Sequence, residues 1–252
     1  MSDPPQFTLI TSTLNSGATL ERCLRSVAGQ TNASFEHLIA DGASSDNTLE
    51  IVEHYCQRYP LRLACSTPDT SLYQAWNRGV EQARGQWLLF LGSDDFLISG
   101  DILSRVAEAI EADPSLGAYR FLYGDTVDAE EPPDWAIYRP NSWLQRLRGV
   151  TEFPTSVFIN GQLFQQGNRF DESYRICGDH KFFMEHDLFT HGEYLPVTMI
   201  SFQQGGISSN RNYERMHYLE RSRMLAELNR SRPWYSECYY WLRSHQRNSR
   251  PS

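Results

Sequence analysis

Two adjacent aspartates, Asp94 and Asp95, directly follow the apolar run 87–91. Such a run is typical of a strand in a sheet that is covered on both faces. By itself, an acidic pair after a strand is usually a solvated turn or a helix cap. Paired carboxylates are also the ligands through which Mg²⁺ or Mn²⁺ binds a substrate phosphate. The pair is therefore a candidate metal site whose interpretation depends on its neighbours.

Two further polar clusters, 11–15 and 41–46, stand at the ends of two other predicted strands. In open α/β sheets, ligands bind beyond the carboxyl ends of the strands. The pair Asp41-Gly42 alone indicates only a turn. Because clusters 11–15, 41–46 and 93–95 all follow strands of one predicted sheet, we expect them to meet in one acidic crevice. Such a crevice repels a diphosphate unless a cation intervenes. Asp41 is also suited to accept a hydrogen bond from a base N–H, such as that of uracil.

Alternating strands and helices must position these clusters. Strands are predicted at 7–12, 35–40, 61–65 and 87–91. Apolar residues at helical spacing lie between them, at 20–27, 49–56 and 72–83, with Asp46 placed to cap the second helix. This alternation predicts a parallel sheet with right-handed crossovers.

The second half of the chain is less regular. We expect helices at 102–110 and 180–190, strands at 119–123, 155–159 and 194–202, and two helices over 211–245 that break near Pro233.

The composition excludes several classes of protein. The net charge of the 252 residues is -8, which argues against nucleic acid as the main partner. The five cysteines include no CxxC pair, so reduced thiols in the cytoplasm fit better than disulfides or a zinc site. The N-terminus does not resemble a signal peptide, and no apolar run is long enough to span a membrane. We therefore expect a cytoplasmic protein.

In the order and spacing of its motifs, the chain resembles the inverting family 2 glycosyltransferases with the GT-A fold. Among these it resembles the non-processive type that serves bacterial polysaccharide synthesis. The resemblance covers about residues 6–210 and rests on Ser12–Asn15, Asp41–Thr48, Asp69, Tyr73–Gly79, Ala83–Trp87, Leu91–Asp95, Phe170–Asp179 and Gly205–Ser208. The segment ending in Asp95 resembles the DxD motif of the family. The QxxRW motif of processive synthases is absent from the sequence.

This resemblance implies an α/β protein with a Rossmann-like, mostly parallel central sheet flanked by helices. It divides the chain into a GT-A domain at 1–210, with a nucleotide-binding half (1–100) and an acceptor-binding half (101–210), and a helical extension at 211–252. It implies transfer of one sugar from a nucleotide-diphosphate sugar, with a UDP-sugar favoured, to a hydroxyl of a saccharide or a lipid-linked saccharide. The reaction would invert the anomeric centre and depend on Mn²⁺ or Mg²⁺.

The resemblance also implies roles for individual residues. Asp94 and Asp95 bind the metal, and Asp179 is the general base, although alone it would suggest a helix N-cap. The nucleotide sugar is bound by Thr13, Asn15, Asp41, Asp69, Asn77, Arg78, Ser93 and Asp94. His180 and His186 are candidates for a third metal ligand.

Departures from the family pattern concern the sugar or the acceptor more than the type of reaction. Gln74 stands where relatives often have Asp, Trp76 where they often have Met, and 153–156 lacks the frequent His-Gln.

Other classes of protein remain as alternatives. A sugar nucleotidyltransferase would need a glycine-rich loop with a basic residue after the first strand, where 11–19 offers only Gly17. A dinucleotide-dependent dehydrogenase would need GxGxxG there. A non-catalytic nucleotide-sugar-binding paralogue would be expected to lose an acidic residue of the site, whereas Asp94, Asp95 and Asp179 are all present.

The segment 207–252 is basic, with nine arginines against four glutamates, and it is rich in Trp and Tyr. This composition suits helices that lie at an anionic membrane surface, peripheral to the inner face of the plasma membrane and close to a lipid-linked acceptor. The alternative is that these helices pack on the sheet or form the contact of a homodimer.

Overall fold

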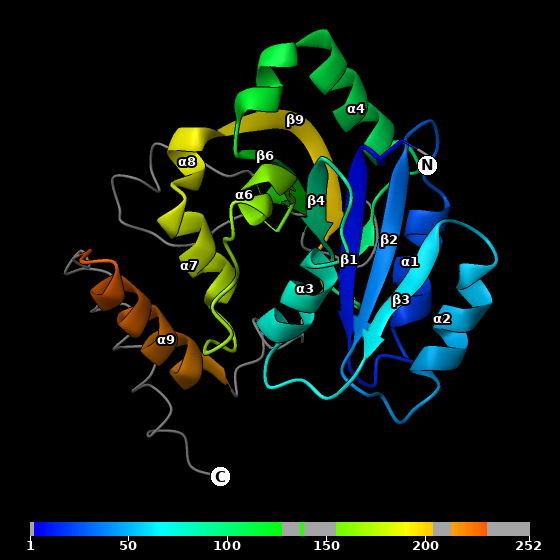
Figure 1. Ribbon diagram of the computed structural model, residues 1–252, viewed down its shortest axis with the longest axis horizontal. Coiled ribbons are helices and arrows are strands. Elements are labelled where there is room, and N and C mark those ends of the chain that lie inside the picture. The colour runs from blue at the N-terminus through cyan, green and yellow to red at the C-terminus, as the bar shows by residue number, and fades with distance from the viewer. Residues whose placement is uncertain (1–2, 128–136, 139–154, 204–212, 231–252) are drawn as a thin grey trace.

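The first four strands alternate with helices along the chain, and the computed structural model pairs all four strands in parallel (Figure 1). The structure describes residues 3–127, 137–138, 155–203 and 213–230. The elements of the first half are β1 (Phe7–Thr13), α1 (Leu20–Ala28), β2 (Phe35–Asp41), α2 (Thr48–Cys56), β3 (Leu61–Ser66), α3 (Leu72–Val80) and β4 (Trp87–Phe90). The predicted strands and helices of this half are confirmed.

The sheet continues beyond β4 with the strands of the second half, in the order β3-β2-β1-β4-β8-β6-β9-β5, and β7 pairs with β6. The elements are β5 (Phe96–Leu97), α4 (Ile102–Ala112), the 3₁₀ helix Pro114–Ala118, β6 (Phe121–Val127), β7 (Ile137–Tyr138), β8 (Val157–Asn160), α6 (Gly161–Gln165), α7 (Gly178–Glu185), α8 (Leu188–His191), β9 (Gly192–Ser201) and α9 (Glu214–Glu227).

In this half, β8 runs antiparallel to both β4 and β6, so the sheet is mostly, and not entirely, parallel. Antiparallel neighbours need no helical crossover between them, so helix–strand alternation does not signal them. The pairing of β6 with β9 is again parallel. The fold is a mixed α/β fold with a mostly parallel central sheet and flanking helices, as predicted.

Two predicted boundaries were inexact for local reasons. The helix predicted at 180–190 is divided into α7 and α8, because Asp187 adopts the left-handed conformation at φ 49°. Asp46 lies just before the cap residue of α2, yet its Oδ1 accepts the backbone N–H of Thr48 at 3.0 Å. It therefore satisfies a free donor of the first turn, as a capping side chain does.

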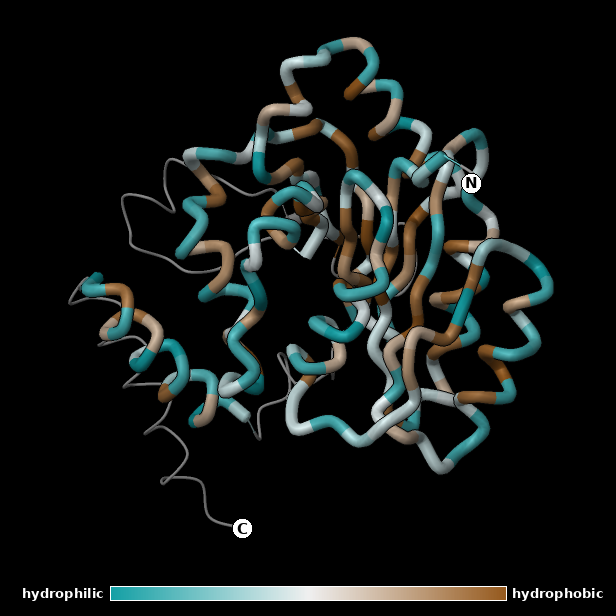
Figure 2. Tube along the Cα trace, viewed as in Figure 1, coloured by the Kyte–Doolittle hydropathy of each residue, from teal (hydrophilic) through white to brown (hydrophobic). Residues whose placement is uncertain are grey.

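Alternating residues of the strands face two separate cores. Leu9 packs with α1, α2 and α4, whereas its neighbour Ile10 packs on the other face with α3, α6 and α7. The stripe that α1 buries consists of Leu20, Cys23, Leu24 and Val27, at the spacing of one helical face. Figure 2 shows the central strands hydrophobic and the outer turns of the helices hydrophilic.

Helix α9 opens the predicted extension and packs beside α7 (Figure 1). Its Met224 and Leu225 are buried in the same core as Phe182 of α7. Lys181, the single lysine of the chain, lies between the two helices and contacts Glu227 of α9 at 3.0 Å. The described part of the extension thus packs against α7 and adds to the core on that face of the sheet. No helix among the described residues has the length and apolarity needed to cross a membrane.

A close approach of backbone to backbone explains Gly85. A Cβ at this position would lie 2.4 Å from the backbone nitrogen of Thr8 and 2.6 Å from the carbonyl carbon of Phe7. Gly85 N also donates to Thr8 Oγ1 at 2.8 Å. Position 85, two residues before β4, must therefore lack a side chain if it is to lie against β1.

Gly85→Ala should destabilise the fold by about 1–3 kcal/mol, the usual cost of adding an atom where backbone must shift. The measurement is urea unfolding followed by circular dichroism. Gly117→Ala is the matched control, since a Cβ there meets nothing within 4 Å. Equal stability of the two variants would contradict this account.

Candidate active site

The loops after β1, β2 and β4 are hydrogen-bonded to one another. Asn15 N donates to Ser44 Oγ at 2.8 Å, and Asn15 Oδ1 accepts from Ser45 N at 2.9 Å. Its backbone is left-handed at φ 50°, which Asn tolerates better than most residues. Ser16 Oγ lies 3.0 Å from Ser93 Oγ. The expected meeting of the three polar clusters at one edge of the sheet is confirmed.

Asp41 is fully buried at the end of β2. Its Oδ1 accepts from Thr13 Oγ1 at 2.8 Å and Ser44 Oγ at 2.6 Å, and its Oδ2 from Ser44 N at 3.0 Å and Ser66 Oγ at 2.7 Å. Burial alone would raise its pKa, but these donors outweigh burial and hold the pKa below its usual value. Four hydrogen bonds use the acceptor capacity of a carboxylate. A base N–H can bind Asp41 only if one hydroxyl turns away.

Asp69 is the second acid at this end of the sheet. Its Oδ1 forms an ion pair with Arg78 of α3, and its Oδ2 lies 2.9 Å from where a Cβ on Gly42 would stand. Burial raises the pKa of Asp69, the nearby charge of Asp41 adds to the rise, and the charge of Arg78 opposes it. Asp69 and Arg78 thus face Asp41 across the turn at Gly42.

Asp94 and Asp95 converge in front of Gly92. A Cβ on Gly92 would lie 2.9 Å from Asp94 Oδ1 and 2.6 Å from Asp95 Oδ2. Asp95 is 7% exposed, and its Oδ1 accepts from Gln203 N at 2.9 Å. Burial, followed by the charge of Asp94, raises the pKa of Asp95 to about 7. Nearby Arg22 only partly offsets this effect.

Residues of this type fit a divalent cation. Two converging carboxylates offer the hard oxygen ligands that Mg²⁺ and Mn²⁺ prefer. Burial and the charge of Asp94 outweigh the hydrogen bond from Gln203 and the charge of Arg22 at Asp95, so a cation would favour its ionised form. In the described part of the chain, the ring of His180 groups with Cys177 and His217 rather than with the acidic pair. The expected third ligand thus remains unassigned.

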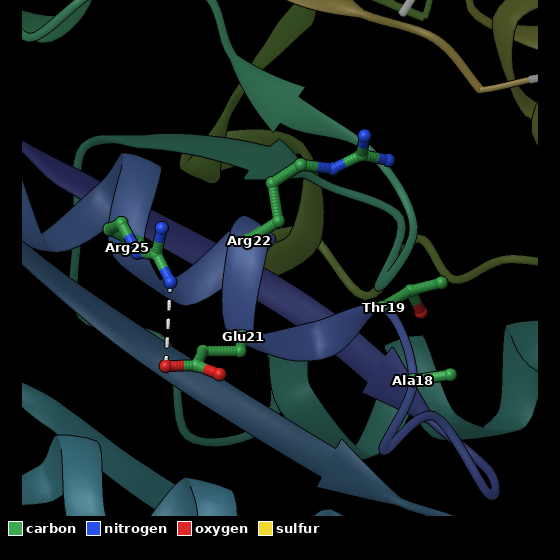
Figure 3. A pocket seen from close by; sticks show the side chains of 5 residues that line it. All are labelled: Ala18, Thr19, Glu21, Arg22 and Arg25. Carbon is green, nitrogen blue, oxygen red and sulfur yellow. Dashed lines mark ion pairs between the residues drawn. The ribbon is translucent and has the colours of Figure 1, made fainter.

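Arg22 links this acidic pair to a hollow beside α1. Its Nη2 donates to the carbonyl oxygen of Asp94 at 3.0 Å, and its guanidinium lies 4.7 Å from the ring centroid of Phe96. Figure 3 shows Arg22 extending away from the ion pair of Glu21 and Arg25. The hollow is lined by Ala18, Thr19, Glu21, Arg22 and Arg25.

Asn77 joins the two halves of the domain. The buried amide donates from Nδ2 to Phe170 O and to Glu172 Oε1, both at 2.9 Å, and accepts from Phe170 N at 3.0 Å. Gln74 Nε2 donates to Glu172 Oε2 at 3.1 Å. Asn77, which is predicted to bind the donor, holds the segment that leads to α7 in this structure.

Asp179 stands in the first turn of α7, not at its N-cap, which is Cys177. Its Oδ1 accepts from the hydroxyl of Tyr73 at 2.9 Å and from His180 N at 2.8 Å. The same hydroxyl lies 2.6 Å from the carbonyl oxygen of Ile176. The contact with Tyr73 thus helps to orient the carboxylate of Asp179. Tyr73 lies on α3, the helix that also carries Arg78 and Asn77.

Several residues of the site were not predicted from the sequence. Arg22 lies on the exposed side of an amphipathic helix, and Tyr73 has the apolar spacing of a core residue. Only the tertiary contacts distinguish them. Gly205–Ser208 and residues 153–154 lie outside the described residues.

The sequence is similar to those of known glycosyltransferases. Residues 8–173 match the model of glycosyl transferase family 2. A PGL/p-HBAD biosynthesis glycosyltransferase of Mycobacterium tuberculosis is 35% identical over 212 residues, which cover 82% of this chain and 80% of the relative. The uncharacterized glycosyltransferase YibD of Escherichia coli is 22% identical, over 92% of this chain and 73% of the relative.

Solved structures share the fold at lower identity. Staphylococcus aureus TarS 1–349 in complex with UDP-GlcNAc matches with a TM-score of 0.67 and 21% identity, over 85% of this chain and 65% of that chain. The match to the longer TarS structure covers 39% of that chain. The mannosyltransferase PcManGT of Pyrobaculum calidifontis in complex with GDP-Man and Mn²⁺ matches with a TM-score of 0.68 and 16% identity, over 92% of this chain and 66% of that chain.

These matches favour the predicted glycosyltransferase over the nucleotidyltransferase, the dehydrogenase and the non-catalytic paralogue. The chain has the GT-A fold and belongs to glycosyl transferase family 2, a family of transferase enzymes.

Proposed function

We propose that this enzyme transfers one sugar from a nucleoside diphosphate sugar, with a UDP-sugar favoured, to a hydroxyl of a saccharide or lipid-linked saccharide. The observation that carries the proposal is the convergence of Asp94 and Asp95 in front of Gly92, where Asp95 has a pKa of about 7. Two converging carboxylates, one of them buried, suit a cation and the diphosphate it accompanies. The TarS and PcManGT structures, with UDP-GlcNAc and with GDP-Man and Mn²⁺, support this donor class.

In this proposal the edge of the sheet binds the nucleotide. Thr13, Asn15 and Asp41 form its floor, and Asp69 with Arg78 forms its side. Since all the acceptor capacity of Asp41 is used internally, the free side of Asp69 is the better placed acceptor for a base N–H. Ser93 joins this floor to the acidic pair through Ser16.

Asp94 and Asp95 would hold Mn²⁺ or Mg²⁺ at the diphosphate. A divalent cation bound there supplies electrostatic stabilisation of the departing diphosphate, an effect of several kcal/mol. Arg22 adds a fixed positive charge close to the acidic pair.

Asp179 would act as the general base in this proposal. An acceptor hydroxyl is a weak nucleophile until its proton is removed. Tyr73 and the backbone of His180 hold Oδ1 of Asp179, so Oδ2 remains to accept that proton. A single displacement by the activated hydroxyl inverts the anomeric centre, through a transition state with oxocarbenium character.

The proposed acceptor fits a peripheral position of the enzyme at a membrane. The helix α9 is used for packing against α7, so a membrane contact would depend on residues 231–252, which lie outside the described residues. These residues include Trp234 and Trp241 among arginines. A homodimer through the same segment is the competing interpretation.

Replacing Asp95 should remove the metal-dependent step. Asp95→Asn keeps the size of the side chain and removes the charge, so binding of UDP in Mn²⁺ should weaken by about tenfold or more, and transfer should fall by more than about 10²-fold. Calorimetric titration with UDP and a transfer assay over a panel of UDP-, GDP- and dTDP-sugars measure both effects. Asp113→Asn, at an exposed cap, is the matched control. Full wild-type activity in EDTA would overturn the metal assignment.

Replacing Asp179 should separate donor binding from transfer. Asp179→Asn should leave UDP affinity within about twofold and lower transfer by at least about 10²-fold, the lower range for general-base catalysis. NMR of the product determines its anomeric configuration. Unchanged transfer, or retention of the configuration of the donor, would exclude this role.

The membrane proposal predicts binding of the full-length chain to vesicles that contain anionic lipid, weakening as salt is raised. Removal of residues 232–252 should reduce that binding by about tenfold or more, since each basic residue near the surface contributes about 1 kcal/mol. Vesicle sedimentation measures it, with neutral vesicles as the control. If the full-length chain does not bind anionic vesicles at low salt, the membrane proposal is wrong and the segment has another role.

A further inference from the structure

A thiol and two imidazoles meet where α9 packs against α7. Cys177, His180 and His217 each offer one ligand atom, and these atoms all lie within 4.8 Å of one another. Cys177 is buried and the two histidines are half-buried. The thiol of Cys177 also donates to the carbonyl oxygen of His217 at 3.8 Å, so the sulfur already lies against the first turn of α9.

The ligand types differ from those of the acidic pair. Oxygen-only sites suit Mg²⁺ and Mn²⁺, whereas one thiolate and two imidazoles suit Zn²⁺ and similar transition metals. Three protein ligands of this kind leave the fourth position of a tetrahedral ion to water or another small ligand.

Charged side chains of both signs surround the cluster. Asp179 and Glu220 lie near Cys177, and Arg221 lies near both Cys177 and His217. The ligand types and their spacing, rather than the net charge around them, therefore favour a cation.

Helix α9 also fixes the backbone just before α7. The carboxylate of Glu220 accepts the backbone N–H groups of Arg175, Ile176 and Cys177 at 2.7, 2.9 and 3.0 Å. Cys177 and His180 are three residues apart, at the cap and in the first turn of α7, and so lie on one side of the helix. The two ligands on α7 therefore have a fixed geometry to which α9 adds the third.

We propose that Cys177, His180 and His217 bind Zn²⁺ at a site separate from Asp94 and Asp95. The bound ion joins the first turn of α9 to the first turn of α7. Asp179 lies between two of the ligands in the sequence, so the ion fastens the segment that presents this carboxylate. The site stands on the geometry of its ligands and does not depend on the proposed function.

The test is a titration of the metal-free, reduced, full-length protein with Co²⁺, which reports a sulfur ligand through a thiolate-to-cobalt charge-transfer band. One equivalent of Co²⁺ should saturate the band, and Zn²⁺ should displace it. Cys177→Ser should abolish the band, and His217→Ala should weaken Co²⁺ binding by about 10²-fold or more, since even residues that only support ligands contribute 10–100-fold. Cys56→Ser and His54→Asn, two exposed positions outside the cluster, are matched controls that should keep it.

A second measurement guards against variants that fail to fold. Zn²⁺ should raise the melting temperature of the wild type by mass action, and this increase should be lost in His217→Ala but kept in Asp95→Asn. The absence of a charge-transfer band in the wild type, or its loss in Cys56→Ser in place of Cys177→Ser, would overturn the proposal. Loss of the Zn²⁺ effect in Asp95→Asn alone would likewise overturn it, because the ion would then belong to the acidic pair.

Discussion

The burial of several carboxylates at the carboxyl edge of the sheet is the main physical constraint on this structure. Asp41, Asp69 and Asp95 lie there with little or no exposure. An unpaired charge in such a position is costly, so each carboxylate needs donors or a counter-charge. The protein satisfies Asp41 with hydroxyl groups and Asp69 with Arg78.

Asp95 is treated differently. Among the described residues, it receives a backbone N–H from Gln203, while Asp94 stands beside it and Arg22 only partly offsets their charge. The result is a carboxylate whose proton affinity is high without a cation and falls when one binds. In the proposed function, this third carboxylate would receive its counter-charge from the cation that accompanies the diphosphate.

The second half of the domain is attached to this edge by buried polar contacts. Asn77 and Gln74 hold Glu172, and Tyr73 holds Asp179, all from the single helix α3. Glu220 of α9 then accepts the backbone N–H groups of Ile176 and Cys177, just before α7. Helix α3 thus carries Arg78 and also positions Asp179, through Tyr73. In the proposed function, one helix would therefore support both the donor side and the acceptor side. The described part of the extension, helix α9, contributes to these contacts.

The sequence by itself determined the elements of the first half and the acidic residues at their ends. Strict spacing, such as that of Leu20, Cys23, Leu24 and Val27, predicts a helix from local periodicity alone, and polar residues after buried strands predict a crevice. The antiparallel insertion of β8 was decided only by the tertiary structure, because its pairing joins segments without a local signal. The same holds for the internal use of Asn77, the contact of Arg22 with Asp94, and the meeting of His217 with Cys177 and His180. A side chain's partner across two elements depends on how those elements pack, and neither its type nor its spacing along the chain contains that information.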